Sequence, residues 1–175
     1  MTTPPASTTA TYAPGAPAIP LAEFDGEMAV TRRLLERVPS DKGPWKPHEK
    51  SFSIGHLGQL ISAMPGWITR TLRDPHIDLS SGARYTYEST ETLLATFDRH
   101  VAEAREALAQ VTGAALAEPW SLKNGEMVLF TLPRGEVTRQ NLSHLVHHRG
   151  QLTVYLRLLD IPLPQVYGPT ADEKW

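Results

Sequence analysis

The chain has 175 residues and no cysteine, and its 17 basic and 19 acidic side chains give a formal net charge of -2. This length favours a single domain with one hydrophobic core. The balanced charge, without a basic run, argues against nucleic acid or an anionic membrane as a partner. Because no thiolate is available, disulfides and cysteine nucleophiles are excluded, and a metal ion would have to be bound by imidazole, carboxylate or water.

Residues 1–20 differ from the rest of the chain, since they are rich in Thr, Ala and Pro and carry no charge. Such a segment buries too little apolar surface to offset its chain entropy. We therefore expect a flexible or partner-covered arm, followed by a single domain at residues 21–175. No apolar run is long enough to cross a bilayer, and the first residues do not resemble a signal peptide. The sequence predicts a cytoplasmic protein without a membrane partner.

Two helices are predicted in the first half of the domain. Apolar residues at three- and four-residue steps mark the first helix over residues 21–38, and Pro39 ends it. The second helix is capped by the hydroxyl of Ser51 or Ser53 and runs to about residue 73. Pro65 lies inside its apolar pattern, so we expect it to kink this helix rather than end it.

Two further helices and a hairpin are predicted in the second half. The third helix is capped by Ser89 or Thr90 and has its exit at Gly113. Between residues 120 and 132, the dipeptide Asn124-Gly125 separates two apolar runs, which is typical of a tight β-hairpin. The last helix begins soon after Pro133 and ends near residue 160. The fold class is therefore all-α, an up-and-down four-helix bundle with a short β-hairpin before the last helix.

A pair of histidines on the last helix is the strongest candidate for chemistry. His144 and His148 are four residues apart, so both imidazoles lie on one face, one turn apart, where they can reach a single ion. Asn141, Gln151 and Tyr155 share roughly that stripe. Neutral imidazole binds Zn, Ni, Fe or Mn, so the pair does not identify the metal. The alternative is a pair of histidines satisfied by hydrogen bonds alone.

A third ligand would have to come from another helix, and His56 on the second helix is the best candidate by residue type. His48, His76 and His100 are expected to be solvated. The second helix has no carboxylate between Ser51 and Arg73, although the first helix offers Asp25 and Glu27.

Other charged groups near the pair have two interpretations each. Arg149 either orients an anionic group or forms an ion pair with an acid on a neighbouring helix. Asp172 and Glu173 either fold back as supporting partners of the site or are solvated. His147 points away from the pair, and only an unligated histidine such as this one is a candidate for a general base.

Residues 144–173 read HLVHHRGQLTVYLRLLDIPLPQVYGPTADE, and with WKPHEKSFSIG near residue 45 and Pro-Gly-Trp at 65–67 they closely resemble the DinB-like family, also called DinB/YfiT-like. The resemblance implies an up-and-down bundle, often a homodimer. It also implies a divalent metal ion held by one histidine of the second helix and a His-x-x-x-His pair of the last, which in this chain is His144 and His148. The expected histidine of the second helix aligns with Leu60, and His56 lies one turn earlier.

Two functions follow as hypotheses. The resemblance implies a metal-dependent enzyme acting on a small molecule, either a transferase of a low-molecular-weight thiol or a hydrolase, in which the metal activates a thiol or water. The alternative is a non-catalytic, dimeric binding or stress-response bundle with a degenerate metal site, which Leu60 favours. Nucleic-acid binding finds no support in the charge balance.

Overall fold

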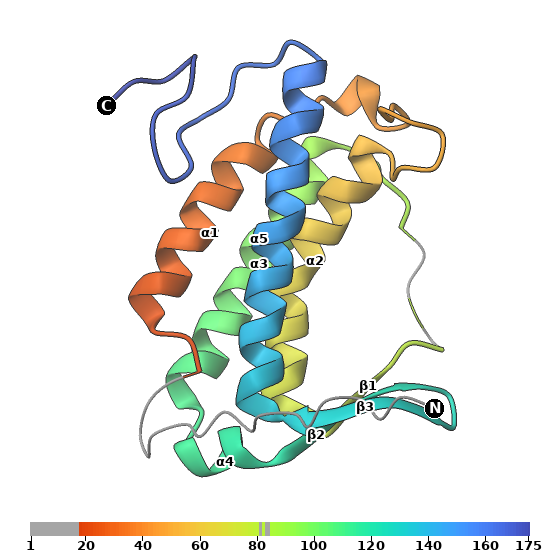
Figure 1. Cartoon of the computed structure of the whole chain (residues 1–175), viewed down its shortest axis with the longest axis vertical. Coiled ribbons are helices and arrows are strands. Elements are labelled where there is room, and N and C mark those ends of the chain that lie inside the picture. Colours follow the sequence, from red (N-terminus) through yellow and green to blue (C-terminus); the bar gives the residue numbers. More distant parts are fainter. Residues whose placement is uncertain (1–17, 81, 83–84) are drawn as a thin grey trace, which may run out of the picture.

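The structure is a computed structural model that describes residues 18–80, 82 and 85–175. The described part is mostly helical, with four long helices, one short helix and a small sheet (Figure 1). The long helices are α1 (Leu21–Leu35), α2 (Ile54–Arg73), α3 (Thr90–Gln110) and α5 (Arg134–Leu158). None of the described helices is long and apolar enough to span a membrane.

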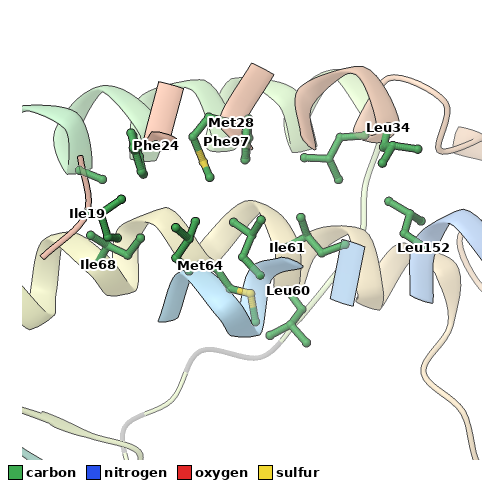
Figure 2. Close-up of a cluster of buried hydrophobic side chains, with 14 of the residues drawn as sticks. Ile19, Phe24, Met28, Leu34, Leu60, Ile61, Met64, Ile68, Phe97 and Leu152 are labelled. Atoms are coloured by element: carbon green, nitrogen blue, oxygen red, sulfur yellow. The ribbon is translucent and has the colours of Figure 1, made fainter. Parts of the chain in front are cut away.

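The helix α2 lies at the centre of the packing, because it contacts both α3 and α5, while α1 packs against α3 and α5. The apolar faces of all four long helices meet in one core, part of which Figure 2 shows. Leu60, Ile61 and Met64 of α2 belong to this core. Of the arm expected at residues 1–20, residues 1–17 lie outside the described residues, whereas Ala18 and Ile19 are buried in the core.

Helix boundaries follow local signals. The Ser53 hydroxyl accepts a hydrogen bond from the His56 N–H at the start of α2, and the Ser89 hydroxyl accepts one from the Thr92 N–H at the start of α3. These bonds satisfy N–H groups that have no partner within the helix. Pro65 does not interrupt α2, which is continuous from Ile54 to Arg73.

The predicted hairpin is confirmed as β2 (Pro119–Asn124) and β3 (Met127–Pro133), and Gly125 in its turn has a φ of 60° that favours glycine. Two elements were not predicted. The strand β1 (His76–Asp78) pairs in parallel with β2, which places His76 in a sheet. The short helix α4 (Gly113–Ala117) follows α3, and a short 3-10 turn covers Ser40–Lys42.

The first turn of α5 is tied to the last turn of α2 by Arg134, which is buried. Its Nη1 donates to the carbonyl oxygens of Thr71, Leu72 and Asp74, at distances of 2.6–3.2 Å. These carbonyls lie at the end of α2, where they have no helical partner, so a guanidinium that donates to all of them replaces the missing bonds. This contact fixes α5, and with it the histidine pair, against α2.

Candidate functional site

The structure brings together the two histidines predicted from α5. The Nε2 atoms of His144 and His148 are 2.9 Å apart, and their ring centroids are 4.6 Å apart. His148 is buried, while His144 is partly exposed beside the indole of Trp67 on α2, with a ring separation of 6.0 Å. The pair therefore lies where α5 meets α2, and one imidazole is accessible from solvent.

Gln151 determines which nitrogen of His148 carries a proton. Its amide oxygen lies 2.7 Å from Nδ1 of His148, and because this oxygen can only accept, Nδ1 donates. In a neutral His148 the lone pair is then on Nε2, which faces His144. The amide nitrogen of Gln151 donates in turn to Nε2 of His147 at 3.1 Å. Gln151 thus links the imidazoles of His147 and His148 and leaves Nε2 of His148 as an acceptor.

The environment favours neutral imidazole at His144. Burial of its ring lowers the pKa of His144, and the neighbouring His148 and His147 lower it further. A neutral pair has one N–H and one lone pair between the two rings, so His144 donates to His148 in the absence of a ligand. In this arrangement the free nitrogen of His144, Nδ1, is an acceptor, while its Nε2 is occupied by the hydrogen bond to His148.

The pair alone also fits a metal ion. Two imidazoles bound at about 2.0–2.1 Å to one ion stand roughly 3 Å apart when the angle between the bonds is close to a right angle. The observed separation of 2.9 Å matches this, and Gln151 orients His148 as a hydrogen-bonded carbonyl orients many metal-ligating histidines.

The structure does not place the predicted third ligand, His56, in a metal-binding group with the pair. The imidazole of His56 is stacked between the rings of Phe52 and Tyr85, with centroid separations of 4.4 and 4.6 Å, and burial lowers its pKa. Leu60 is buried in the apolar core. Within residues 18–80, 82 and 85–175, no group of three His, Cys, Asp or Glu side chains is arranged to hold a metal ion. The three-histidine centre expected from the resemblance is therefore not assembled among these residues.

The remaining histidines are not all solvated as predicted. His48 is exposed, and its Nδ1 accepts a hydrogen bond from the Lys50 N–H. His100 on α3 was expected in solvent, but its Nδ1 lies 2.9 Å from the Ser62 carbonyl on α2 and its ring covers Gly66. The absence of a side chain at Gly66 is what admits the ring, so this histidine joins two helices.

Arg149 points away from the histidine pair and into the protein. Its Nη1 lies 2.6 Å from a carboxylate oxygen of Glu27 on α1, so of the two interpretations the ion pair is observed. Its Nη2 donates to the Tyr167 hydroxyl at 2.7 Å, and that hydroxyl also contacts the Glu27 carboxylate. Arg149 is thus fully occupied in joining α1, α5 and the C-terminal segment, and it does not face a ligand at the pair.

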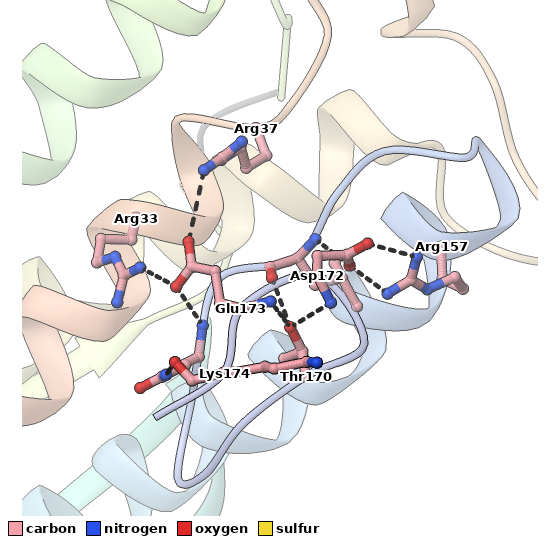
Figure 3. Close-up of polar contacts among 9 residues, drawn as sticks. Arg33, Arg37, Arg157, Thr170, Asp172, Glu173 and Lys174 are labelled. Carbon is pink, nitrogen blue, oxygen red and sulfur yellow. Dashed lines mark hydrogen bonds and ion pairs between the residues drawn. The ribbon is translucent and has the colours of Figure 1, made fainter.

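Asp172 and Glu173 do fold back, but onto arginines of α1 and α5 rather than onto the histidines (Figure 3). Asp172 lies 2.5 Å from Arg157 and accepts the Leu163 N–H, while Glu173 lies 2.5 Å from Arg33 and accepts the Gln165 N–H. The closing YGPTADE segment is therefore a structural clamp in which the chain end is fastened to two helices.

Several of these partners were not visible in the sequence. The spacing of α5 placed Gln151 on the stripe of the pair, but nothing in the sequence indicated that Trp67 packs on His144. The contact of Glu27 with Arg149 joins residues 122 positions apart, as the hydrogen bond to the Glu27 carbonyl shows. Contacts of such separation depend on the packing of helices and not on local pattern.

The fold and the site define a mostly helical protein with a pair of imidazoles on its last long helix, of which His148 is buried and His144 is accessible. A family model for the DinB superfamily matches residues 23–152, and the chain belongs to this superfamily. It is 41% identical over 159 residues to the uncharacterized protein YrdA of Bacillus subtilis strain 168, and the match covers 89% of each protein.

Two crystal structures show the same fold. A DinB-like protein of Bacillus subtilis, YjoA, has a TM-score of 0.65 and 20% identity, and the match covers 83% of this chain and 95% of that one. A DinB-like protein of Bacillus cereus ATCC 10987 has a TM-score of 0.64 and 19% identity, with coverage of 84% and 95%. At these identities the likeness concerns the fold.

Proposed function

We propose that this protein is an up-and-down four-helix bundle of the DinB/YfiT-like type that binds a small molecule beside His144 and His148 without a complete metal centre. The observation that carries this proposal is that the position expected for the third metal ligand is occupied by an apolar residue, Leu60. Leu60 is part of the core and His56 is held in a ring stack, and among the described residues no third His, Cys, Asp or Glu side chain joins the pair to form a metal-binding group. Two imidazoles without a third protein ligand bind divalent ions weakly compared with a closed three- or four-ligand site.

The surface around the pair suits a ligand with both polar and flat apolar parts. His144 offers a hydrogen bond at the surface, and the Trp67 ring beside it offers an aromatic face. His148 and Gln151 hold His144 in place from behind. In this function the imidazoles recognise a molecule, and no reaction step depends on a bound metal.

The test is the metal content and metal affinity of the purified protein and of Leu60→His. We expect no stoichiometric divalent ion in the wild-type chain after reconstitution with Zn, Ni, Fe or Mn. Leu60→His supplies the missing imidazole and should tighten Zn binding by about tenfold or more. Gln59→His is the matched control, because it adds a histidine to the adjacent position, on another face of α2, and should leave the affinity unchanged.

A second candidate is a divalent-metal-dependent enzyme of the thiol transferase or hydrolase type, acting on a small molecule. The 2.9 Å spacing of the Nε2 atoms and the orientation of His148 by Gln151 favour it. In this case the wild-type protein retains one ion per chain and His144→Ala with His148→Ala removes it. Full retention of the ion by the double variant would exclude a metal at the pair, whereas stoichiometric metal in the wild type would overturn the first proposal.

The homodimer implied by the family is also a proposal. On the outer face of α5, Val154 and Leu158 are more than half exposed, and Gly150 has open space around it. A second copy packed against this uncharged stripe would bury these side chains. Light scattering coupled to gel filtration measures the state, and Val154→Glu should shift a dimer of this kind to monomer.

A further inference from the structure

A cavity of about 150 Å³ lies between α2, α3 and the segment that precedes α3. It is separate from the histidine pair, since neither His144 nor His148 lines it. A cavity of this volume accommodates a molecule about the size of benzene, with roughly six non-hydrogen atoms. Its walls are mainly polar or aromatic, so a polar ligand suits it better than a hydrocarbon.

The aromatic walls are held in fixed positions. The Tyr87 ring lies over Gly43 and Gly55, and a Cβ at position 55 would stand 2.6 Å from its Cγ, so only glycine leaves room for the ring there. The Tyr87 hydroxyl is hydrogen-bonded to Thr90 at 3.2 Å. Tyr85 stacks on His56 with a centroid separation of 4.6 Å. Both tyrosines are thus positioned by specific contacts on α2 and beside it.

Several polar groups of the lining have no hydrogen-bonding partner among the described residues. Gln59 lines the cavity, and its amide oxygen is buried without a hydrogen bond to any described residue. Within the part of the chain that the structure describes, the side chains of Glu88 and Thr96 also make no hydrogen bond. Unpartnered polar groups are costly when buried, and a ligand that donates hydrogen bonds would satisfy them.

The charge of the lining favours a cation. Among the described residues of the lining, Glu88 is the only charged one, and none of them is Lys, Arg or His. The start of α3 does not offer an anion site, because the Thr90 N–H already donates to Ser40 and the Thr92 N–H to Ser89. A carboxylate beside two tyrosine rings is an arrangement that attracts an ammonium group by charge and by cation–π contact.

From this arrangement we propose that the cavity binds a small organic ammonium compound, with Glu88 as counter-charge, Tyr85 and Tyr87 as aromatic walls, and Gln59 and Thr96 as hydrogen-bonding partners. The site is independent of the function proposed for the histidine pair. A ligand of this size is expected to bind with a Kd of roughly micromolar to millimolar.

The test is a titration of the full chain, followed by amide chemical shifts, with three probes of nearly equal size. They are 4-amino-1-butanol, which carries one ammonium group, the neutral 1,4-butanediol, and the anion γ-hydroxybutyrate. With the amino alcohol we expect saturable chemical-shift changes at Ala63, Leu93 and Thr96. The diol should bind at least about tenfold more weakly, and the anion should not bind.

Glu88→Gln should weaken binding of the amino alcohol by about tenfold, since Glu88 is exposed and its replacement preserves shape and fold. Glu91→Gln is the matched control, because it removes the same charge from the first turn of α3 outside the cavity, and it should bind like the wild type. Four outcomes would each overturn the proposal. The diol and the amino alcohol bind equally well, or the two variants lose the same affinity for the amino alcohol. Alternatively, the shifted amides lie mainly on α5, or no probe gives a saturable shift up to about 50 mM.

Discussion

The guanidinium of Arg149 lies 2.6 Å from the carboxylate of Glu27, and this ion pair joins α5 to α1 inside the protein. The Arg149 side chain is 1% exposed, and it also donates to the Thr31 hydroxyl and the Tyr167 hydroxyl. A guanidinium in this setting is satisfied only while all its partners are present. Arg149 therefore contributes to the packing of three segments, although it directly follows a histidine of the candidate site.

Arg149→Ala tests this role. The change leaves the Glu27 carboxylate without its buried partner, so we expect the free energy of unfolding to fall by about 3–5 kcal/mol. Urea denaturation measures the loss. Arg99→Ala is the control, because Arg99 pairs with Glu103 on the exposed face of α3, and such pairs contribute about 1 kcal/mol or less. Similar losses in the two variants would contradict a structural role for Arg149.

The clamp formed by the C-terminal segment should open in acid. The Arg157 guanidinium beside Asp172 lowers the pKa of that carboxyl, and the Gln165 N–H and Arg33 lower the pKa of Glu173. A lowered folded-state pKa means that the stabilisation is complete above the ordinary values of 3.8 and 4.5. It is lost as the pH falls below them and through the folded-state values.

Amide hydrogen exchange measures this opening. The N–H groups of Leu163 and Gln165 donate to the two carboxylates, so their protection factors should decline below about pH 4.5, once corrected for intrinsic exchange rates. Asp172→Asn should reduce protection of Leu163 at neutral pH, while Asp41→Asn, on the exposed 3-10 turn, should not. Protection that is independent of pH would show that the segment is held by other contacts.

The long helices and the hairpin could be predicted because their signals are local. Ser53 and Ser89 cap helices with bonds to residues three positions away, and Asn124-Gly125 forms its turn from adjacent residues. The spacing of His144 and His148 likewise required only the geometry of one helix. Predictions of this kind depend only on residues a few positions apart in the sequence, so they hold for any tertiary packing of the helices.

The rest depended on contacts between distant segments. The strand β1 forms because His76–Asp78 finds β2 more than forty residues later, as the pairing of His76 with Ser121 shows. His56 is stacked between the rings of Phe52 and Tyr85, and no local pattern indicates that stack. The sequence also did not identify the partner of Arg149, because Glu27 reaches it only through the packing of α1 against α5.

His144 gives the stability of the protein a dependence on pH near neutrality. Its folded-state pKa is lowered from 6.5 by burial and by the neighbouring histidines, so the unfolded chain binds more protons between that lowered value and 6.5. The stability is therefore full above pH 6.5 and falls as the pH decreases toward the folded-state pKa.

Urea denaturation of the wild type and of His144→Gln at about pH 7.5 and about pH 5.5 tests this sign. The stability of the variant relative to the wild type should improve at the lower pH, because glutamine does not titrate. His56, whose pKa burial also lowers, is present in both proteins and cancels in the comparison. A relative stability of the variant that worsens in acid would contradict a lowered pKa at His144.

Alanine should stabilise the protein at two glycines and destabilise it at a third. At Gly26 on α1 and Gly150 on α5 an added Cβ meets no atom within 4 Å, so alanine should stabilise the helix by about 0.5–1 kcal/mol. At Gly55 the Cβ would stand 2.6 Å from the Tyr87 ring, so alanine should destabilise by about 1–3 kcal/mol and displace the wall of the cavity.

Thermal and urea denaturation measure all three variants, and Gly26→Ala is the reference because its surroundings are open in a single chain. If Gly150→Ala is destabilising while Gly26→Ala is stabilising, something packs closely on the outer face of α5. That result would support the proposed second copy there, and its concentration dependence would identify it as self-association. If both stabilise equally, the face of α5 at Gly150 is free in solution and a dimer through it is excluded.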